Sequence, residues 1–544
     1  MIPDSFFERM HSLCILDLSG TEIKSLPSSL CNLVNLRGLY LKDCRKLEEL
    51  PSQVGALRQL EVLHLGGTTA IRYLPREVGE LTRLKRLIVG LKRCDWQIFR
   101  DDDDEDPCSE DDDDEDTKEW NMKLRVPTGI IPKLPYLEEL SLSVNLGYYS
   151  DDKKQWDNER MEVVVEELCR LEHLTYLDAY FPKVECLEHF LSHSKSVKAT
   201  SSWFRRFRFR VGTEMFVSEG ERCLVYNGGF GTSHAAIMET LARCSCFRLQ
   251  DHRTARKLSE LGLANMNELK ECWVDSCEKM ETLFDGDEKQ EACALLPNLE
   301  KLDIANLPKL RSLCDGPLLL GSLSKLRFLH LIDCENLKKV FQLGIIRLLC
   351  SLEALSVECC SNVEEIIEIE EEEEMSMSVA SHTHNVISYN NDRLILPNIK
   401  RIHLQNLPEL VSICRGFSNF EWPSLETIGI IECPKLKSLS FLSNGTNIVA
   451  PTLKKISGSS EWWEALEWED NDIKQRLQPF LLSCHFGSVF PKSLQPSHHF
   501  SSSSAIFHIT VDQDINKHTN KTVISWIKQA VCKMILSGPI SQRK

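Results

Sequence analysis

The chain has 544 residues, of which 42% are hydrophobic and 27% charged, so it can bury a large core and disorder over its whole length is excluded. Its formal charge of −17 comes mostly from two clusters, Asp101–Asp116 and Glu364–Glu374, which hold 13 and 8 of the 81 acidic residues. The rest of the chain carries 64 basic and 60 acidic side chains, so no acidic field covers the whole protein.

No run of about 18 uninterrupted apolar residues occurs, so no transmembrane helix is predicted. The N-terminal residues Met1–Asp4 contain no basic segment leading into an apolar one, so the sequence shows no secretory signal. Without secretion, the 22 cysteines are expected to be reduced thiols rather than disulfides. We therefore expect a cytoplasmic protein.

A repeated leucine spacing organises residues 1–90, the N-terminal regular repeats. It begins with Leu13, Leu16, Leu18, Thr21, Ile23 and Leu26 and returns after 23 and then 24 residues. The two leucines of each L-x-L point to one face of a short strand, and the residue between them points to the opposite, outer face. One unit cannot bury its apolar face alone, so the units must stack. The predicted fold is an α/β leucine-rich-repeat solenoid (horseshoe). It has short parallel strands on the concave face, an irregular or short-helical convex side, and acidic loop insertions.

Residues 91–123 interrupt this pattern with an acidic run that repels itself and is expected to be a disordered insertion. Calcium binding is the alternative, but the run lacks the D-x-D-x-D-G pattern with a terminal Glu. Residues 124–260 are degenerate repeats, in which Leu174, Leu177 and Ala179 fit the spacing. Within them, Arg205–Arg210 alternates basic and aromatic residues, as a strand with one charged face would. We expect a structural or partner contact there, with a nucleic-acid surface as the alternative.

Clear repeats resume at 261–369, pause at the acidic and polar loop 370–393, and end at 394–483 with a tryptophan-rich cap. Cys44, Cys277, Cys334, Cys360 and Cys433 fall where each strand turns inward, and they are expected to be buried thiols. Trp462, Trp463 and Trp468 are expected to close the core. In the tail, 484–544, a linker precedes a basic amphipathic helix at Lys521–Leu536. That helix either docks on the repeats, lies on an anionic membrane or belongs to a disordered extension.

Several segments resemble one known family. They are Ile2–Phe7 with Leu13–Thr21 and Leu26-Pro27, then Leu296–Leu299 with Leu307–Cys314, then Trp422–Leu425 with Cys433–Leu436, and the closing Trp462–Trp468. They resemble the repeats of plant coiled-coil, nucleotide-binding, leucine-rich-repeat disease-resistance proteins. The resemblance covers roughly residues 1–482, with 150–260 poorly matched. Leu-Pro stands where extracellular plant receptors of this fold usually place Gly-x-Ile-Pro, which favours the intracellular class.

The resemblance implies a recognition module of an intracellular immune receptor, which senses pathogen effectors or a guarded host protein and restrains a nucleotide-dependent switch. The sequence begins inside the repeats, so we expect a fragment of a longer protein. ADP or ATP is expected only if a nucleotide-binding domain precedes it. The alternative is a leucine-rich-repeat adaptor such as a ubiquitin-ligase substrate receptor, which would need a ligase-docking helix at one end. Neither function requires nucleic acid.

No P-loop, G-x-S-x-G, H-E-x-x-H or kinase signature occurs, and no Cys or His set has zinc spacing. The sequence therefore predicts no catalytic, cofactor-binding or metal-binding residue, and no enzyme. The candidate protein-binding residues occupy the concave position between paired leucines: Asp17, Tyr40, His64, Ile88, Asp303, His330, Ser356 and His403. Such a column on rigid strands suits a protein surface rather than a small molecule.

Overall fold

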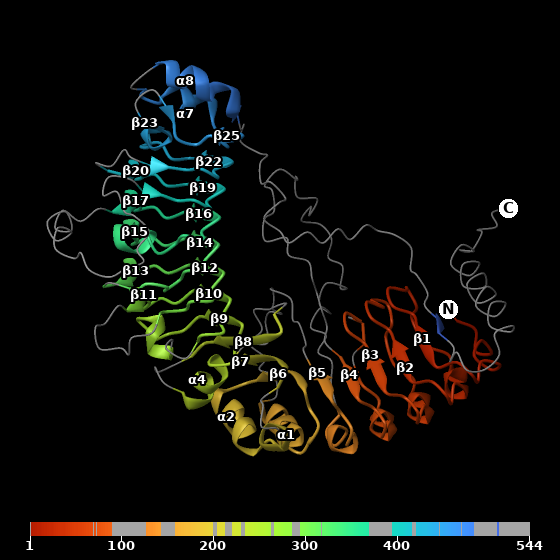
Figure 1. Cartoon of the computed structure of the whole chain (residues 1–544). Helices are drawn as coiled ribbons and strands as arrows, with labels where there is room; N and C mark the ends of the chain where they lie inside the picture. The colour runs from red at the N-terminus through yellow and green to blue at the C-terminus, as the bar shows by residue number, and fades with distance from the viewer. Residues whose placement is uncertain are drawn as a thin grey trace, which may run out of the picture.

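The structure is a computed structural model. It describes residues 2–68, 70–71, 73–89, 127–142, 158–199, 204–212, 220–229, 234–262, 266–285, 294–316, 318–368, 394–415, 420–444, 447–468, 471–483 and 509–510. In these residues, successive short strands form one long sheet along the inner side of an arc, and helices and turns lie on its outer side (Figure 1). The predicted leucine-rich-repeat solenoid is confirmed.

Five short strands form the N-terminal arm and pair in parallel in chain order. They are β1 (Ile15–Asp17), β2 (Gly38–Tyr40), β3 (Val62–His64), β4 (Arg86–Ile88) and β5 (Glu139–Ser141). The outer side carries the 3-10 helices η1 (Ser28–Asn32), η2 (Ser52–Ala56), η3 (Arg76–Glu80) and η5 (Ile131–Lys133). The first three begin directly after Pro27, Pro51 and Pro75, because the fixed φ of proline suits the entry to a helical turn. β4 pairs directly with β5, although residues 90–126 separate them in sequence.

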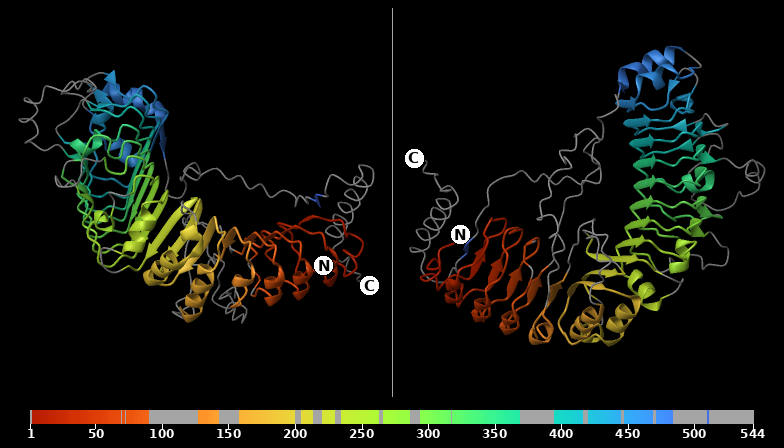
Figure 2. Two further views of the ribbon diagram at one scale, coloured as in Figure 1. Left: turned by 60° about the horizontal axis from the view of Figure 1, so that its bottom comes forward. Right: turned by 180° about the vertical axis from the view of Figure 1, so that it is seen from behind.

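The middle of the chain, where we expected degenerate repeats, has longer strands and outer α-helices (Figure 2). The strands are β6 (Tyr176–Phe181), β7 (Arg206–Val211), β8 (Arg222–Asn227) and β9 (Cys246–Gln250); the helices are α1 (Asn158–Cys169), α2 (Val184–His193), α3 (Lys195–Ala199) and α4 (Ala235–Leu241). Phenylalanines replace leucines in this core. Phe181 contacts Phe190 of α2 and Phe209 of β7, with ring centroids 5.6 and 5.4 Å apart. Larger rings fill the wider space beneath an α-helix.

The C-terminal arm continues the inner sheet with β10 (Glu271–Asp275), β12 (Lys301–Ala305), β14 (Phe328–Ile332), β16 (Ala354–Glu358), β19 (Arg401–Gln405), β22 (Thr427–Ile431), β25 (Lys455–Gly458) and β26 (Leu481–Ser483). Its outer side carries short helices and turns, as predicted, and in addition short parallel ladders. β11 (Thr282–Asp285) pairs with β13 (Ser312–Asp315), and β17 (Glu365–Glu368) pairs with β15 (Lys339–Gln342) and β20 (Ser412–Cys414). Smaller elements are η6 (Leu258–Leu261), α5 (Leu343–Ile346), β18 (Leu394–Ile395), β21 (Phe420–Glu421), η8 (Ser440–Leu442), β23 (Ser443–Asn444) and β24 (Asn447–Ile448).

One left-handed residue follows each inner strand from β9 to β22 and turns the chain outward. These residues are Asp251, Ser276, Asn306, Asp333, Cys359, Asn406 and Glu432, with φ between +50° and +55°. The N–H of Ser276, for example, donates to the Ala305 carbonyl of the next strand at 3.1 Å. The N-terminal arm uses Gly67 at the equivalent turn, where a Cβ would lie 2.0 Å from Asp43 Oδ1.

Small side chains at the inward turns hydrogen-bond to nearby backbone, as expected, and two of them in the N-terminal arm reach the preceding repeat. Thr68 Oγ1 donates to the Leu41 carbonyl at 2.6 Å, and Cys44 Sγ to the Leu18 carbonyl at 3.0 Å. All five predicted turn cysteines are buried free thiols. Burial raises the pKa of Cys277 and Cys433 to about 12, so both stay protonated and unreactive at neutral pH.

The tryptophan-rich cap is built by α7 (Ser460–Glu464), α8 (Asn471–Leu477) and η9 (Gln478–Phe480). Trp463 is 1% exposed, packs against Trp468 with ring centroids 5.1 Å apart, and donates from Nε1 to Gln478 Oε1 at 2.8 Å. Ile473 and Leu477 of α8 are buried beside it. Trp463 is thus the fully buried member of the predicted cap, and Trp462 and Trp468 pack partly buried against the core.

In the tail, β27 (Ile509–Thr510) pairs antiparallel with β1, with Ile15 opposite Thr510. The predicted helix at 521–536 lies outside the described residues. The acidic residues beyond Glu368 and the acidic run between residues 90 and 126 also lie outside them. Among the described helices, none is long and apolar enough to cross a membrane.

Candidate protein-recognition surface

All eight predicted binding residues lie half-buried on the inner strands, and they form two groups of direct neighbours. Asp17, Tyr40, His64 and Ile88 are successive register partners on β1–β4. Asp303, His330, Ser356 and His403 are successive register partners on β12, β14, β16 and β19. The concave column expected from the L-x-L spacing therefore exists in both arms.

The two groups do not belong to one continuous column. Ile88 continues through Ser141 and Asp178 to Arg208, whereas Asp303 leads back through Trp273, Arg248 and Val225 to Arg210. Arg208 and Arg210 are two residues apart on β7. The leucine frame, meaning the positions along each strand that carry the core residues, therefore steps by two residues in the middle of the sheet. The longer strands β6 and β7 make this step, because each places three residues in the core instead of two. These residues are Leu177, Ala179 and Phe181 on β6 and their register partners Phe207, Phe209 and Val211 on β7.

Local contacts orient the N-terminal group. Asp17 Oδ1 accepts from the Ser19 N–H at 2.9 Å, and His64 Nδ1 accepts from the Gly66 N–H at 3.1 Å. The rings of Tyr40 and His64 lie 6.2 Å apart. Burial, aided by nearby basic residues, lowers the pKa of His64, so its imidazole is neutral at physiological pH.

The C-terminal group forms a connected polar cluster with two residues that the sequence did not single out, Glu358 and Gln405. His330 Nε2 lies 3.3 Å from Glu358 Oε1, and its Nδ1 lies 3.9 Å from Asp303 Oδ1. Ser356 Oγ donates to Glu358 Oε1 at 2.6 Å. His403 Nε2 lies 3.1 Å from Gln405 Oε1 and 4.0 Å from Glu358 Oε1. One carboxylate thus joins side chains from three neighbouring strands.

The neighbours of this polar cluster set its shape. Gly429 follows His403 in the column, and a Cβ at Gly429 would lie 2.6 Å from His403 Nδ1, so the glycine leaves room for the ring. At the other end, Trp273 lies between Arg248 and Lys301, which are 4.1 and 4.9 Å from its ring centroid. Trp273 occupies the L-x-L position between Cys272 and Val274, so the same spacing rule identifies it. The cluster and Trp273 give the arm a mixed polar and aromatic surface.

Charge in the cluster depends on pH. Burial lowers the pKa of His330, as does Lys301, but Glu358 and Asp303 outweigh them and the net shift is upward. Burial raises the pKa of Glu358, but the contacts with His330, Ser356 and His403 outweigh it and the net shift is downward. The raised His330 pKa stabilises the fold below about pH 6.5, and this stabilisation is lost as pH rises through the folded-state value. The lowered Glu358 pKa stabilises the fold above about pH 4.5.

Replacing His330 with Gln is therefore expected to lower the melting temperature most near pH 5.5 and less at pH 8.5. The effect is about 1 kcal/mol at most, because the His330 side chain is 35% exposed and solvent screens the pair. Thermal melts of wild type and variant at the two pH values measure the difference. An equal gap at both values would contradict the ion pair.

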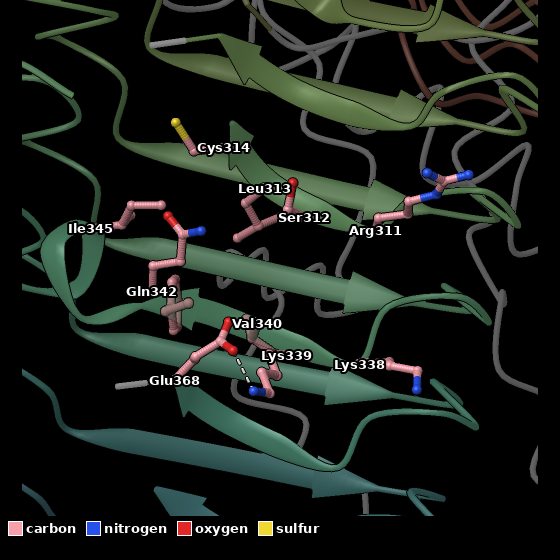
Figure 3. A pocket seen from close by; sticks show the side chains of 11 residues that line it. Arg311, Ser312, Leu313, Cys314, Lys338, Lys339, Val340, Gln342, Ile345 and Glu368 are labelled. Carbon is pink, nitrogen blue, oxygen red and sulfur yellow. Dashed lines mark hydrogen bonds and ion pairs between the residues drawn. The ribbon is translucent and has the colours of Figure 1, made fainter. Parts of the chain in front are cut away.

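A cavity of about 310 Å³ lies on the outer side of the C-terminal arm, where β13 and β15 belong to separate ladders (Figure 3). Arg311 and Lys338 lie at its rim, and Lys339 pairs with Glu368. No predicted binding residue lines it. The cavity is a break between outer ladders and is not part of the concave surface.

The inner sheet and its stacked leucines define a leucine-rich-repeat protein, and comparisons with known proteins show which repeats it resembles. A family described as plant disease resistance protein RPS2-like, leucine-rich repeats, matches residues 311–450, and a leucine-rich repeat region family matches residues 6–95. The chain is 25% identical over 503 residues to disease resistance protein At4g27190 of Arabidopsis thaliana, covering 88% of this chain and 43% of that protein. It is 30% identical over 461 residues to the probable disease resistance protein At4g27220 of the same plant, covering 82% and 43%.

The repeats are thus similar to those of plant disease resistance proteins over most of the chain, as the sequence resemblance predicted. The chain spans less than half the length of these two relatives. Among solved structures, the leucine-rich-repeat protein LIC12759 of Leptospira interrogans is 18% identical, with a TM-score of 0.36, covering 69% of this chain and 83% of that one. The functional domain of InlJ from Listeria monocytogenes is 12% identical, with a TM-score of 0.35, covering 83% and 69%.

Proposed function

We propose that the chain is the non-catalytic recognition module of an intracellular plant immune receptor, and that its concave face binds a pathogen effector or a guarded host protein. The observation that carries the proposal is the C-terminal polar cluster of Asp303, His330, Ser356, Glu358 and His403, in which neighbouring repeats present hydrogen-bonding groups on one rigid face. Side chains held by one another lose little entropy on binding, so such a surface is preorganised.

The longer relatives support a wider role. In a receptor of that length, the repeats would also contact the receptor's own switch domain, and that domain rather than this chain would bind ADP or ATP. We place the protein in the cytoplasm, where reduced, buried cysteines are stable. A leucine-rich-repeat adaptor, such as a ubiquitin-ligase substrate receptor, remains the second candidate. The two differ in whether a nucleotide-binding domain or a ligase-docking helix accompanies the repeats in the whole protein.

The test compares concave and non-concave variants of the full chain in a binding screen against plant and pathogen proteins. The concave variant carries His330→Ala, Ser356→Ala and His403→Ala. The matched control carries Lys309→Ala, Glu335→Ala and Asn362→Ala, which are exposed residues of the same arm outside the inner strands. We expect the concave variant to weaken binding by tenfold or more, because interface energy concentrates in a few central residues. Equal loss in both variants would contradict the assignment of the face.

A further inference from the structure

The middle of the sheet carries a second surface of different chemistry, on β7, β8 and β9. β7 presents Arg206, Arg208 and Arg210 on its concave side, while Phe207, Phe209 and Val211 fill the core. β9 adds Arg248, and the three strands contain no carboxylate residue. Figure 1 shows these strands at the bend where the N-terminal arm meets the C-terminal arm. The expected strand with one charged face is thus part of a wider surface.

Aromatic rings and carboxylates of the flanking strands hold the guanidinium groups in place. Arg206 lies 4.9 Å from the Tyr176 ring centroid and pairs with Glu139 at 2.9 Å. Arg248 lies 4.1 Å from the Trp273 ring centroid. Arg208 donates from Nε to the Gly220 carbonyl at 3.0 Å. A guanidinium fixed in this way loses little freedom when it binds a carboxylate through two parallel hydrogen bonds.

The role of Arg210 differs from that of the other three. It is 3% exposed and pairs with Asp178, so it anchors the surface instead of contacting a partner. Arg206 is 43% exposed, and Arg208 and Arg248 are half-buried. We call Arg206, Arg208 and Arg248, with the rings of Tyr176 and Trp273, the arginine surface.

We propose that the arginine surface docks an extended, carboxylate-rich segment of a partner protein. Positive charge held on rigid strands complements such a segment, and side chains of an extended peptide recur on one face about every 6.6 Å. A single-stranded nucleic acid fits less well, because it needs aromatic faces on which bases stack. In the arginine surface, Arg248 of β9 and Lys301 of β12 lie against the Trp273 ring, and Arg206 lies over the Tyr176 ring. Cations therefore already occupy the aromatic faces that bases would need.

The test uses the full chain and three fluorescent probes: a twelve-residue peptide of alternating Asp and Gly, its Asn–Gly counterpart, and a twelve-nucleotide single-stranded DNA. We expect the acidic peptide to bind most tightly, with an affinity that falls as salt rises. The Asn–Gly peptide should bind at least tenfold more weakly. No measurable binding of the acidic peptide, or tighter binding of the DNA, would overturn the proposal.

Variants then locate the binding. The double variant Arg208→Gln, Arg248→Gln should bind the acidic peptide at least fivefold more weakly than wild type. The double variant Arg208→Lys, Arg248→Lys keeps the positive charge but removes the planar guanidinium groups, so its affinity for the acidic peptide should fall by a smaller factor. The control Arg58→Gln with Arg83→Gln removes two arginines outside the inner strands and should bind as wild type does. Equal binding by the Gln variant and wild type would overturn the proposal, as would an equal loss in the control. The C-terminal polar cluster is intact in every variant, so this test and that of the proposed function fail independently.

Discussion

Replacing Asp178 with Ala is expected to lower the free energy of unfolding by about 3–5 kcal/mol, because it leaves the Arg210 charge buried without its partner. The two side chains are each 3% exposed, and Arg210 Nη2 donates to Asp178 Oδ1 at 2.8 Å. Ser141 Oγ donates to Asp178 Oδ2 at 3.0 Å, so one carboxylate joins β5, β6 and β7 where the leucine frame steps by two residues. Thermal and chemical unfolding measure the loss.

Two controls separate burial from charge in this experiment. Asp178→Leu combined with Arg210→Met removes both charges and should recover most of the lost stability. Glu172→Ala breaks the pair with Lys195, whose nitrogen lies 2.7 Å away, but both side chains are more than half exposed. It should leave the free energy of unfolding almost unchanged, because solvent screens the pair. If Asp178→Ala lowered the free energy of unfolding as little as Glu172→Ala does, the Asp178–Arg210 pair would not stabilise the sheet where the leucine frame steps.

Replacing Trp463 with Ala is expected to cost about 3–5 kcal/mol, since it leaves a large cavity at the C-terminal end of the core. The change removes the packing against Trp468 and the hydrogen bond to Gln478. The last repeats should therefore unfold at a lower temperature than the rest.

Trp463→Phe keeps one ring and should lose a smaller part of the stability. Leu482→Ala is the matched control near the same end, because Leu482 is 53% exposed. An unchanged melting curve for Trp463→Ala would mean that the tryptophans do not close the core.

The sequence predicted the repeats and the concave position well, because both follow from one local rule. In L-x-L the middle residue must face away from the stacked leucines, and this placed His330 and His403 correctly without any knowledge of their contacts. The same rule applied to Cys272 and Val274 identifies Trp273. Glu358 lies at the end of β16, one residue after the second apolar residue of its L-x-L pair, so the rule does not select it. Its contacts come from side chains of three neighbouring strands.

The register step and the outer helices were not predictable in this way. Between residues 158 and 260 the core uses Phe207, Phe209 and Phe247 in place of leucine, so the leucine frame is hidden. The step arises because β6 and β7 each bury a third residue, and strand length depends on packing against other elements, such as α2 against β6, rather than on local propensity. The outer ladders were missed for a similar reason, since β15 and β17 are short and gain stability only by pairing.

Recognition by the concave face of the C-terminal arm is tested most directly by site-specific photo-crosslinking to a partner found in the binding screen. A photoreactive amino acid would replace Ser356, at the centre of the polar cluster, or Asn362, an exposed residue of the same repeat outside the inner strands. We predict a cross-link to the partner from position 356 and none from position 362. Cross-linking from position 362 with none from 356 would contradict the account.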